Sequence, residues 1–379
     1  MTAVVGWLAV LRTHPLRQVL AALAVWLLAG CAPDDPFGGN TPKFFAADAY
    51  PTELSQWNLL LQRGEALALN PAAQTYDVNM PLFSDYAAKH RALWLPPDTQ
   101  LAPQPDGKLT FPVGSIISKT FLYPQGHAGA TELTRLTEPV IATRGAQVVE
   151  TRLMVRQANG WEAMSYVWQG NDAYLKRTGA VVPVKTSASG SDTFSYVVPS
   201  ANECASCHAT DHRSGQLQPI GLQLAQLQSA ESPGATSNHS AEQLTARGWL
   251  LNTPAVAAPY PSWEDRRDPT SHARAYLDSN CAHCHSKTGP AKTSGLDLTR
   301  NNNEPHAMGI CKAPIAAGKG SGGRLYSIVP GAPDESIISY RLQSTDPSRR
   351  MPEIGRSLTH AAGLLVVNQW IASIAGECR

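Results

Sequence analysis

The sequence predicts an α+β protein of more than one domain, with a β-rich, sandwich-like N-terminal domain followed by a mostly α-helical region. Between residues 45 and 200, apolar and polar residues alternate in short runs that end at Pro or Gly, which is typical of β-strands. After residue 200, apolar residues recur every three or four positions, as they do in helices. The chain has 379 residues, 43% of them hydrophobic, so it is long and apolar enough for two cores.

The first residues indicate export. "MTAVVGWLAVLRTHPLRQVLAALAVWLLAGC" has a basic front, an apolar run and no acidic residue, which predicts a signal peptide over residues 1–30. The run is too short for a membrane-spanning helix. Its end, "LAGC", resembles a bacterial lipobox; the resemblance implies that Cys31 is a lipid anchor and that Ala32 favours the outer membrane. The alternative is a chance cysteine. Residues 31–44, rich in Pro, Gly and Asp, are expected to be a flexible tether.

The charge balance argues against a nucleic-acid partner. The chain has 31 Lys and Arg against 30 Asp and Glu, and the signal peptide removes only Arg12 and Arg17, which leaves 29 against 30. Nucleic-acid binding depends on an excess of positive charge. No strongly charged partner is indicated.

Three segments support the β-rich domain, expected over residues 45–200. "VVETRLMVRQANGWEAMSYVWQ" has alternating apolar residues on both sides of Asn159-Gly160, a strong hairpin signal. "LTFPVGSIISKTFLYP" and "DTFSYVVP" are interpreted as further strands, and a short helix is expected near "TELSQWNLLLQRG". Because alternate residues of a hairpin face inward, Trp161, Tyr166 and Trp168 are expected to be core residues.

A cluster of charged residues stands in "MPLFSDYAAKHR". Asp85, Lys89 and His90 are close together there and could form a site. A solvated charged face is the favoured interpretation, because charged residues are seldom buried.

The region after residue 200 divides at a Pro-rich linker, expected over residues 253–269. Before it, residues 201–252 contain the helical patterns "LQPIGLQLAQLQ" and "SAEQLTARGWLL". After it, residues 270–379 are expected to form a compact helical domain, with helices at "TSHARAYLDSN" and "LTHAAGLLVVNQWIASIAG" that cross each other. The last helix has one apolar face and a glycine where a C-terminal cap belongs: Leu364, Val367, Ile371, Ile374 and Gly376.

Two Cys-x-x-Cys-His pentapeptides, "CASCH" and "CAHCH", are the strongest functional signal in the chain. Two cysteines at this spacing can form thioethers to the two vinyl groups of a haem, and the adjacent His then binds the iron. The sequence therefore predicts two covalently attached haem c groups. The predicted thioether residues are Cys204, Cys207, Cys281 and Cys284, and the predicted axial residues are His208 and His285.

Two other interpretations of these cysteines are weaker. A zinc site would need the two pairs to come together across a long intervening segment, and it would leave both His residues without a role. A thioredoxin-like redox pair belongs to a βαβ unit, which the pattern does not indicate.

The second pentapeptide has a candidate for the opposite side of its iron. In "STDPSRRMPEIG", Met351 comes before a Pro in a short irregular segment ahead of the last helix, which looks like the ligand loop of class I cytochromes c. A thioether ligand raises the reduction potential of a haem. The alternatives are that Met351 is a core residue, or that Met308 is the ligand.

The first pentapeptide has no such partner nearby. No Met lies between His208 and the second pentapeptide, and His212 is too close in sequence to reach across a haem ring. Three possibilities stay open: a ligand from elsewhere in the fold, a vacant or water-bound position that admits oxygen, peroxide or nitric oxide, or no haem at all. The protein candidates are His239, His272, Met164, His127 and Met308.

Two cysteines remain, Cys311 and Cys378. In an exported protein two such cysteines suggest a disulfide, worth about 4 kcal/mol on the chain-entropy model because it closes a long loop. Two free thiols are the alternative.

The chain resembles an uncharacterised bacterial family of dihaem c-type cytochromes, often lipoproteins, with a β-rich N-terminal region and a C-terminal class I-like cytochrome c domain. The resemblance covers most of the mature chain. It rests on "YDVNMPLFSDYAAKHRALWLP", "FPVGSIISKTF", "ETRLMVR", "WEAMSYVW", "NECASCH", "RAYLDSNCAHCH", "VPGAPDESIISYR" and "RRMPEIG". It implies electron transfer at the cell envelope. Dihaem cytochrome c peroxidases also have two pentapeptides, but their haem domains are both helical.

Two functions follow as hypotheses. The first is a lipid-anchored, periplasm-facing cytochrome that passes single electrons between redox partner proteins. The second is a haem enzyme, peroxidase-like or acting on another small molecule, whose open first haem receives electrons from the second.

Overall fold

The computed structural model describes residues 36–124, 135–185, 193–228, 238–251 and 258–379. The chain divides into residues 1–40 and residues 41–379, and the sheets, the helices and both pentapeptides belong to the second unit. Its strands are β1 (Leu60–Arg63), β2 (Ala66–Leu69), β3 (Gln74–Thr75), β4 (Ala88–Trp94), β5 (Ala102–Pro103), β6 (Leu109–Thr110), β7 (Ile116–Pro124), β8 (Arg135–Leu136), β9 (Val140–Ala142), β10 (Ala146–Gln157), β11 (Gly160–Gln169), β12 (Asp172–Leu175), β13 (Ala180–Val184) and β14 (Phe194–Val198).

The helices are short, and most of them follow the last strand. The α-helices are α2 (Ala201–His208), α3 (Leu224–Leu227), α4 (Ser240–Ala246), α5 (Pro269–Leu277), α6 (Ile337–Gln343) and α7 (Ala361–Ser373). The 3-10 turns are η1 (Leu54–Trp57), η4 (Lys292–Ser294), η5 (Gly318–Ser321) and η6 (Pro333–Glu335), and η3 (Asp278–Ala282) is a π-helical turn.

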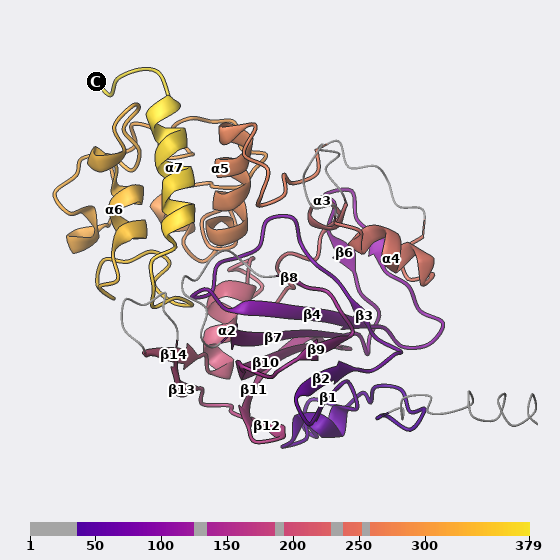
Figure 1. Cartoon of the computed structure of the whole chain (residues 1–379). Helices are drawn as coiled ribbons and strands as arrows, with labels where there is room; N and C mark the ends of the chain where they lie inside the picture. Colours follow the sequence, from indigo (N-terminus) through magenta and orange to yellow (C-terminus); the bar gives the residue numbers. More distant parts are fainter. Residues whose placement is uncertain (1–35, 125–134, 186–192, 229–237, 252–257) are drawn as a thin grey trace, which may run out of the picture. The chain divides into compact units, whose positions relative to one another are not determined.

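Seven strands form the main sheet, in the order β12-β11-β10-β7-β4-β3, with β8 beside β4 (Figure 1). All pairs are antiparallel except β4 with β8. A three-stranded sheet has the order β1-β2-β9, and β13-β14 and β5-β6 are two-stranded. The β-rich N-terminal region that the sequence predicts is therefore present.

The hairpin of β10 and β11 is present, with its turn displaced by one position from the prediction. Gln157 pairs with Gly160, so Ala158 and Asn159 form the turn. Gly160 has a φ of +148°, which glycine adopts readily because it lacks a Cβ. The glycine is used as the first residue of β11 and not inside the turn.

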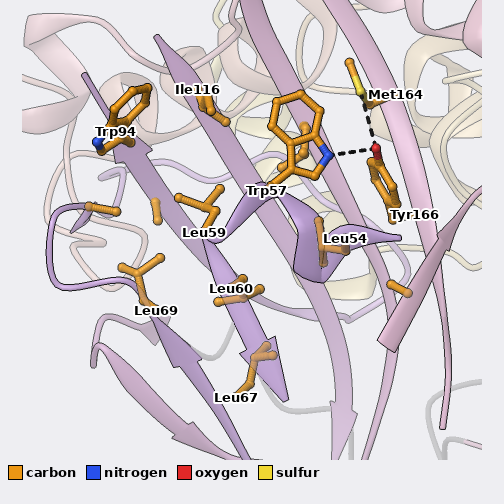
Figure 2. Packing of buried hydrophobic residues seen from close by; sticks show 14 of the residues in the cluster. Leu54, Trp57, Leu59, Leu60, Leu67, Leu69, Trp94, Ile116, Met164 and Tyr166 are labelled. Atoms are coloured by element: carbon orange, nitrogen blue, oxygen red, sulfur yellow. Dashed lines mark hydrogen bonds between the residues drawn. The ribbon is translucent and has the colours of Figure 1, made fainter. Parts of the chain in front are cut away.

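One face of the main sheet packs against the three-stranded sheet and against η1. The two sheets and η1 share one apolar core (Figure 2). Trp57 is fully buried in it, and its indole Nε1 donates a hydrogen bond to the Tyr166 hydroxyl at 2.8 Å. Trp161 and Tyr166 are buried and Trp168 is partly buried, as predicted. The short helix expected near residues 52–64 ends after one turn, because Leu60–Arg63 pairs with β2 as a strand instead.

The helices after residue 258 pack around their own core, in which α5 and α6 lie against α7 (Figure 1). The predicted apolar face of the last helix is present: Val367 and Ile371 are buried there, and Leu364 is partly buried. The predicted cap is wrong, because α7 ends at Ser373, before Gly376 is reached. In the preceding segment, α3 is a single turn, shorter than its apolar pattern predicts.

Hydrogen bonds from side chains of the β-rich region to the backbone join it to the segment just before α7. The Asp85 carboxylate accepts from the backbone N–H groups of Ser357 at 2.8 Å and Leu358 at 2.7 Å. The Tyr86 hydroxyl donates to the Thr359 carbonyl at 2.8 Å. Asp85 and Tyr86 both have a positive φ, a costly conformation for residues other than glycine, and these bonds hold them in it.

The solvated charged face expected at Asp85, Lys89 and His90 is wrong. The three residues are 4%, 3% and 0% exposed. Alternation along β4 places Lys89 and His90 on opposite faces of the main sheet, so these two do not share a site. The charge of Asp85 acts on Lys89 and raises its pKa, against the larger effect of burial. The sequence does not reveal this burial, because the covering segments come from distant parts of the chain.

Candidate functional site

The first pentapeptide forms most of α2. Ser200 begins the helix with a capping box, in which its side chain accepts from the Glu203 N–H and the Glu203 carboxylate accepts from the Ser200 N–H. Cys204 and Cys207 follow on this helix, and His208 is its last residue. The capping box therefore fixes where α2 begins, and with it the positions of the cysteine pair and the histidine along the helix.

The His208 ring is oriented by one hydrogen bond. Its Nδ1 lies 2.8 Å from the backbone carbonyl oxygen of Gln218. A carbonyl oxygen can only accept, so Nδ1 has the proton and the lone pair is on Nε2. An imidazole held in this way by a carbonyl is typical of metal-binding histidines.

The second pentapeptide begins inside the π-helical turn η3, which directly follows α5. The Asp268 side chain caps α5 by accepting from the N–H groups of Thr270 and Ser271. His285 is 8% exposed, and its Nδ1 lies 3.0 Å from Ser294 Oγ. Because that hydroxyl donates its own proton to the Ala291 carbonyl at 2.7 Å, Nδ1 is the donor and Nε2 again has the lone pair.

The two pentapeptides lie against each other. Cys284 Sγ lies 3.4 Å from the Ser206 carbonyl oxygen, and the Thr288 hydroxyl donates to the Thr210 carbonyl at 3.2 Å. A side-chain hydrogen bond between Cys207 and Cys284 lowers the pKa of Cys207 and raises that of Cys284. The cysteine pairs, which the sequence treats as separate sites, are therefore parts of one site.

A cavity of about 1200 Å³ opens beside this site. It exceeds the roughly 300–1,000 Å³ of ordinary small-molecule pockets. Its wall includes residues of both pentapeptides, of the main sheet and of the segment before α7: Cys207, His208, Cys281, His283, Lys119, Arg152, Arg356 and His360. His208, with its free Nε2, and one cysteine of each pair, Cys207 and Cys281, line this volume, whereas His285 does not.

The segment around Met351 is organised by Arg356, which is 5% exposed. The Arg356 guanidinium donates to the Met351 carbonyl at 3.0 Å, to the Ser344 carbonyl at 2.8 Å and to the Leu358 carbonyl at 3.1 Å. A buried guanidinium needs several acceptors, and these carbonyls supply them. Arg356 therefore fixes the loop that contains Met351.

Two side chains near Met351 interact electrostatically with the second pentapeptide. Burial and then the charge of Arg341 lower the pKa of His285 to about 4, and the Arg341 carbonyl accepts from the Met351 N–H at 3.0 Å. The Glu353 carboxylate acts on Cys284 and raises its pKa, after larger effects of the Cys207 hydrogen bond and burial. Met351 is half-buried, and neither it nor His285 lines the cavity.

The described candidates for the sixth ligand of the first site do not line the cavity. Met164 is in the core shared by the two sheets, and His239 is exposed at the start of α4. His272 Nδ1 contacts the Asp265 carbonyl at 2.6 Å. Met308 Sδ accepts from Arg274, and His212 is exposed. His127 lies outside the described residues, as does Cys31.

Three residues that sequence reasoning missed belong to this site. His283, between the cysteines of the second pentapeptide, lines the cavity and helps to lower the pKa of Cys207 of the first, after the larger effect of Cys284. The His360 ring stacks on the Phe83 ring with 4.3 Å between the ring centroids, and burial lowers the pKa of His360 to about 3. Arg356 is the third. The sequence could have indicated His283, because this residue lies inside a pentapeptide. No pattern in the sequence indicates His360 or Arg356.

The disulfide that the sequence predicts is present, with Cys311 Sγ and Cys378 Sγ 2.11 Å apart. Across the described ranges, no three His, Cys, Asp or Glu side chains come close enough together to hold a metal ion among themselves. In the same ranges, no helix is both long and apolar enough to span a bilayer.

Searches against protein-family models, curated proteins and solved structures find no match to the chain.

Proposed function

We propose that this chain is a dihaem c-type cytochrome that transfers single electrons, with its two haems attached side by side. The observation that supports it best is the packing of the two pentapeptides, with Cys284 Sγ 3.4 Å from the Ser206 carbonyl. Motifs that bound unrelated groups would have no reason to share one surface and one cavity.

The roles of the residues follow from their chemistry. Cys204 and Cys207, and Cys281 and Cys284, form the thioethers that hold each haem. His208 and His285 each present Nε2, because Nδ1 donates to the Gln218 carbonyl and to Ser294 Oγ. The haem iron supplies the one-electron chemistry, and the protein sets its potential through ligands, burial and nearby charge.

In this proposal the region from residue 270 onward is the class I-like cytochrome c domain, and Met351 would hold the iron of its haem together with His285. The packing of α5 against α7 supports this assignment, as do the electrostatic links from Arg341 to His285 and from Glu353 to Cys284. A Met ligand favours ferrous iron, so this haem would have the higher potential.

The proposed location is the bacterial cell envelope. The signal peptide over residues 1–30 and a lipid on Cys31 would anchor the chain to a membrane, with the outer membrane favoured by Ala32. Its partners would then be redox proteins of the periplasm. Haem attachment outside the cytoplasm agrees with this location.

Haem content per chain tests the proposal. Purified protein should contain two covalently bound haems by pyridine haemochrome absorbance. Cys204→Ala with Cys207→Ala should contain one, and so should Cys281→Ala with Cys284→Ala. The matched control, Cys311→Ser with Cys378→Ser, also removes a cysteine pair and should still contain two. A wild-type ratio of zero refutes the proposal.

A haem enzyme is the second candidate, and the cavity beside His208 favours it, because none of the described sixth-ligand candidates lines that cavity. An open iron there would bind a small molecule. The ferrous absorption spectrum with and without carbon monoxide separates the two functions. A spectrum in which one haem binds carbon monoxide supports the enzyme. A spectrum of two low-spin haems that carbon monoxide does not change supports electron transfer alone.

A further inference from the structure

Three positively charged side chains lie in a row across the main sheet. Arg91 of β4 and Arg152 of β10 each pair directly with Lys119 of the strand between them, β7. Directly paired residues of neighbouring strands are side by side on one face of a sheet, and like charges there repel. The row is therefore unfavourable for the sheet by itself.

The two ends of the row have counter-ions within the chain. Arg91 Nη1 lies 2.8 Å from Asp77 Oδ1. Arg152 makes two bonds to the fully buried Glu150 carboxylate, at 2.7 and 3.0 Å. Each arginine is thus paired with one carboxylate. Of the two, Glu150 also acts on Lys119 through its charge, but this effect on the pKa of Lys119 is smaller than the repulsion from Arg91 and Arg152.

The side chain of Lys119, at the centre, makes no hydrogen bond or ion pair within the part of the chain that the structure describes. It lines the cavity, as do His208 and Cys207. Burial, then the charges of Arg91 and Arg152, lower the pKa of Lys119 to about 7. A cation in such surroundings costs free energy unless an anion joins it.

Lys89 shows what a satisfied lysine on this face looks like. It lies on β4, two residues from Arg91 and on the same face, and is 3% exposed. Its ammonium donates to the Leu82 carbonyl. Lys119 differs because, among the described residues, its ammonium has no such acceptor, and it lines the cavity.

We propose that the row of Arg91, Lys119 and Arg152 binds an oxygen anion inside the cavity, with Lys119 as its main ion partner. The ligand is a carboxylate or a small oxyanion such as phosphate, because these groups accept hydrogen bonds from ammonium and guanidinium groups. Two sources offer that chemistry: a haem propionate, and a free anion that enters the cavity. The site itself is inferred from the register of the sheet and goes beyond the proposed function; a free anion as its ligand does not depend on that function, whereas a haem propionate rests on it.

The test compares Lys119→Met with Lys319→Met in the full-length protein as purified. Both changes remove one lysine charge, and Lys319 is exposed in η5, away from the cavity. Lys119→Met should fold, because it relieves repulsion in the row, and thermal melting without added anion checks that it does. Phosphate binding is then measured by calorimetry at constant ionic strength, and the midpoint potential of each haem is measured as a function of pH.

A free anion as the source gives one pattern of results. Phosphate binds the wild type and raises its melting temperature, as any ligand specific for the folded state does. Binding is about tenfold weaker or more in Lys119→Met, the loss expected for one charge-assisted hydrogen bond, and is unchanged in Lys319→Met.

A propionate as the source gives a different pattern. Phosphate then binds none of the proteins, while Lys119→Met lowers the midpoint potential of one haem and alters its pH dependence, because a positive charge near ferric iron is lost. Lys319→Met changes neither. If the two variants behave alike in both measurements, the proposal is overturned.

The haem content of the same preparations judges the cytochrome proposal separately. Lys119-dependent phosphate binding by a chain without haem keeps the anion site and rejects the cytochrome. If the protein contains two haems but neither phosphate binding nor a midpoint potential depends on Lys119, the cytochrome proposal stands and the anion site is rejected.

Discussion

Cys284 Sγ lies 3.4 Å from the carbonyl oxygen of Ser206, although the two residues are 78 positions apart in the chain. Ser206 stands between the cysteines of the first pentapeptide, and Cys284 is the second cysteine of the other. Groups attached to these motifs would meet at one surface. In the proposed cytochrome, that proximity would let electrons pass between the two haems without a third carrier.

Met351 is expected to be the second axial ligand at His285, so Met351→Ala should remove the weak long-wavelength absorption band that ferric His/Met haem shows. Its loss would follow from replacing the thioether sulfur with water or another ligand. The haem-to-protein ratio should stay the same, because the thioethers are untouched.

Met308→Ala is the matched control for that experiment. Met308 Sδ contacts Arg274, and its truncation should leave the band in place. If the band survives in Met351→Ala and disappears in Met308→Ala, the ligand has been assigned to the wrong methionine.

Cys311→Ser with Cys378→Ser should lower the free energy of unfolding by about 4 kcal/mol, because the bond closes a loop of 67 residues that the unfolded chain would otherwise explore. Chemical denaturation of the double variant measures it. Wild-type protein treated with a reductant should lose a similar amount. A loss below about 1 kcal/mol would show that the bond contributes little, contrary to the chain-entropy account.

His90 should make the fold sensitive to acid. Burial lowers the pKa of His90 from its ordinary 6.5 to about 4, so the unfolded state takes up a proton between these values and the folded state does not. Stability is therefore full above pH 6.5 and falls as the pH drops toward 4, by on the order of 3 kcal/mol from this residue.

His90→Gln tests that pH dependence, because its amide can still donate to the Glu138 carbonyl that His90 Nε2 contacts at 3.1 Å. The free energy of unfolding, measured from pH 7 to pH 4, should fall less steeply in the variant. Parallel curves for the variant and the wild type would mean that His90 does not titrate as described.

Cys31→Ser should move the protein from the membrane fraction to the soluble fraction, because the lipid can attach only to that thiol. Fractionation and immunoblotting of cells measure it. Cys378→Ser serves as the cysteine control and should stay with the membrane. Unchanged membrane association of Cys31→Ser would reject the lipobox resemblance.

Local patterns in the sequence predicted local structure well. The alternation around residues 148–169 predicted the hairpin, and the apolar face of the last helix was predicted from its spacing. Errors occurred at ends and in short segments, such as the turn at Ala158 and Asn159 and the single turn of α3. At those points tertiary contacts outweigh weak local preferences.

The candidate site was predicted only as two separate pieces. The pentapeptides identified Cys204, Cys207, Cys281 and Cys284 with their histidines, because the spacing needed for haem attachment is itself local. No local pattern indicated that His283 would reach Cys207. That contact depends on how the segments on either side of the linker fold back onto the main sheet.

The sequence by itself predicted which residues have the chemistry: the cysteine pairs with their histidines, Met351 before its proline, and the two cysteines of the disulfide, of which the structure confirms the disulfide. Only the tertiary structure decided that the pentapeptides share one cavity and that Lys119 stands between Arg91 and Arg152 on its wall. The reason is that alternation along a strand specifies which residues share a face, but not which strands become neighbours. Register and long-range packing decide that, and with it the charge that surrounds the site.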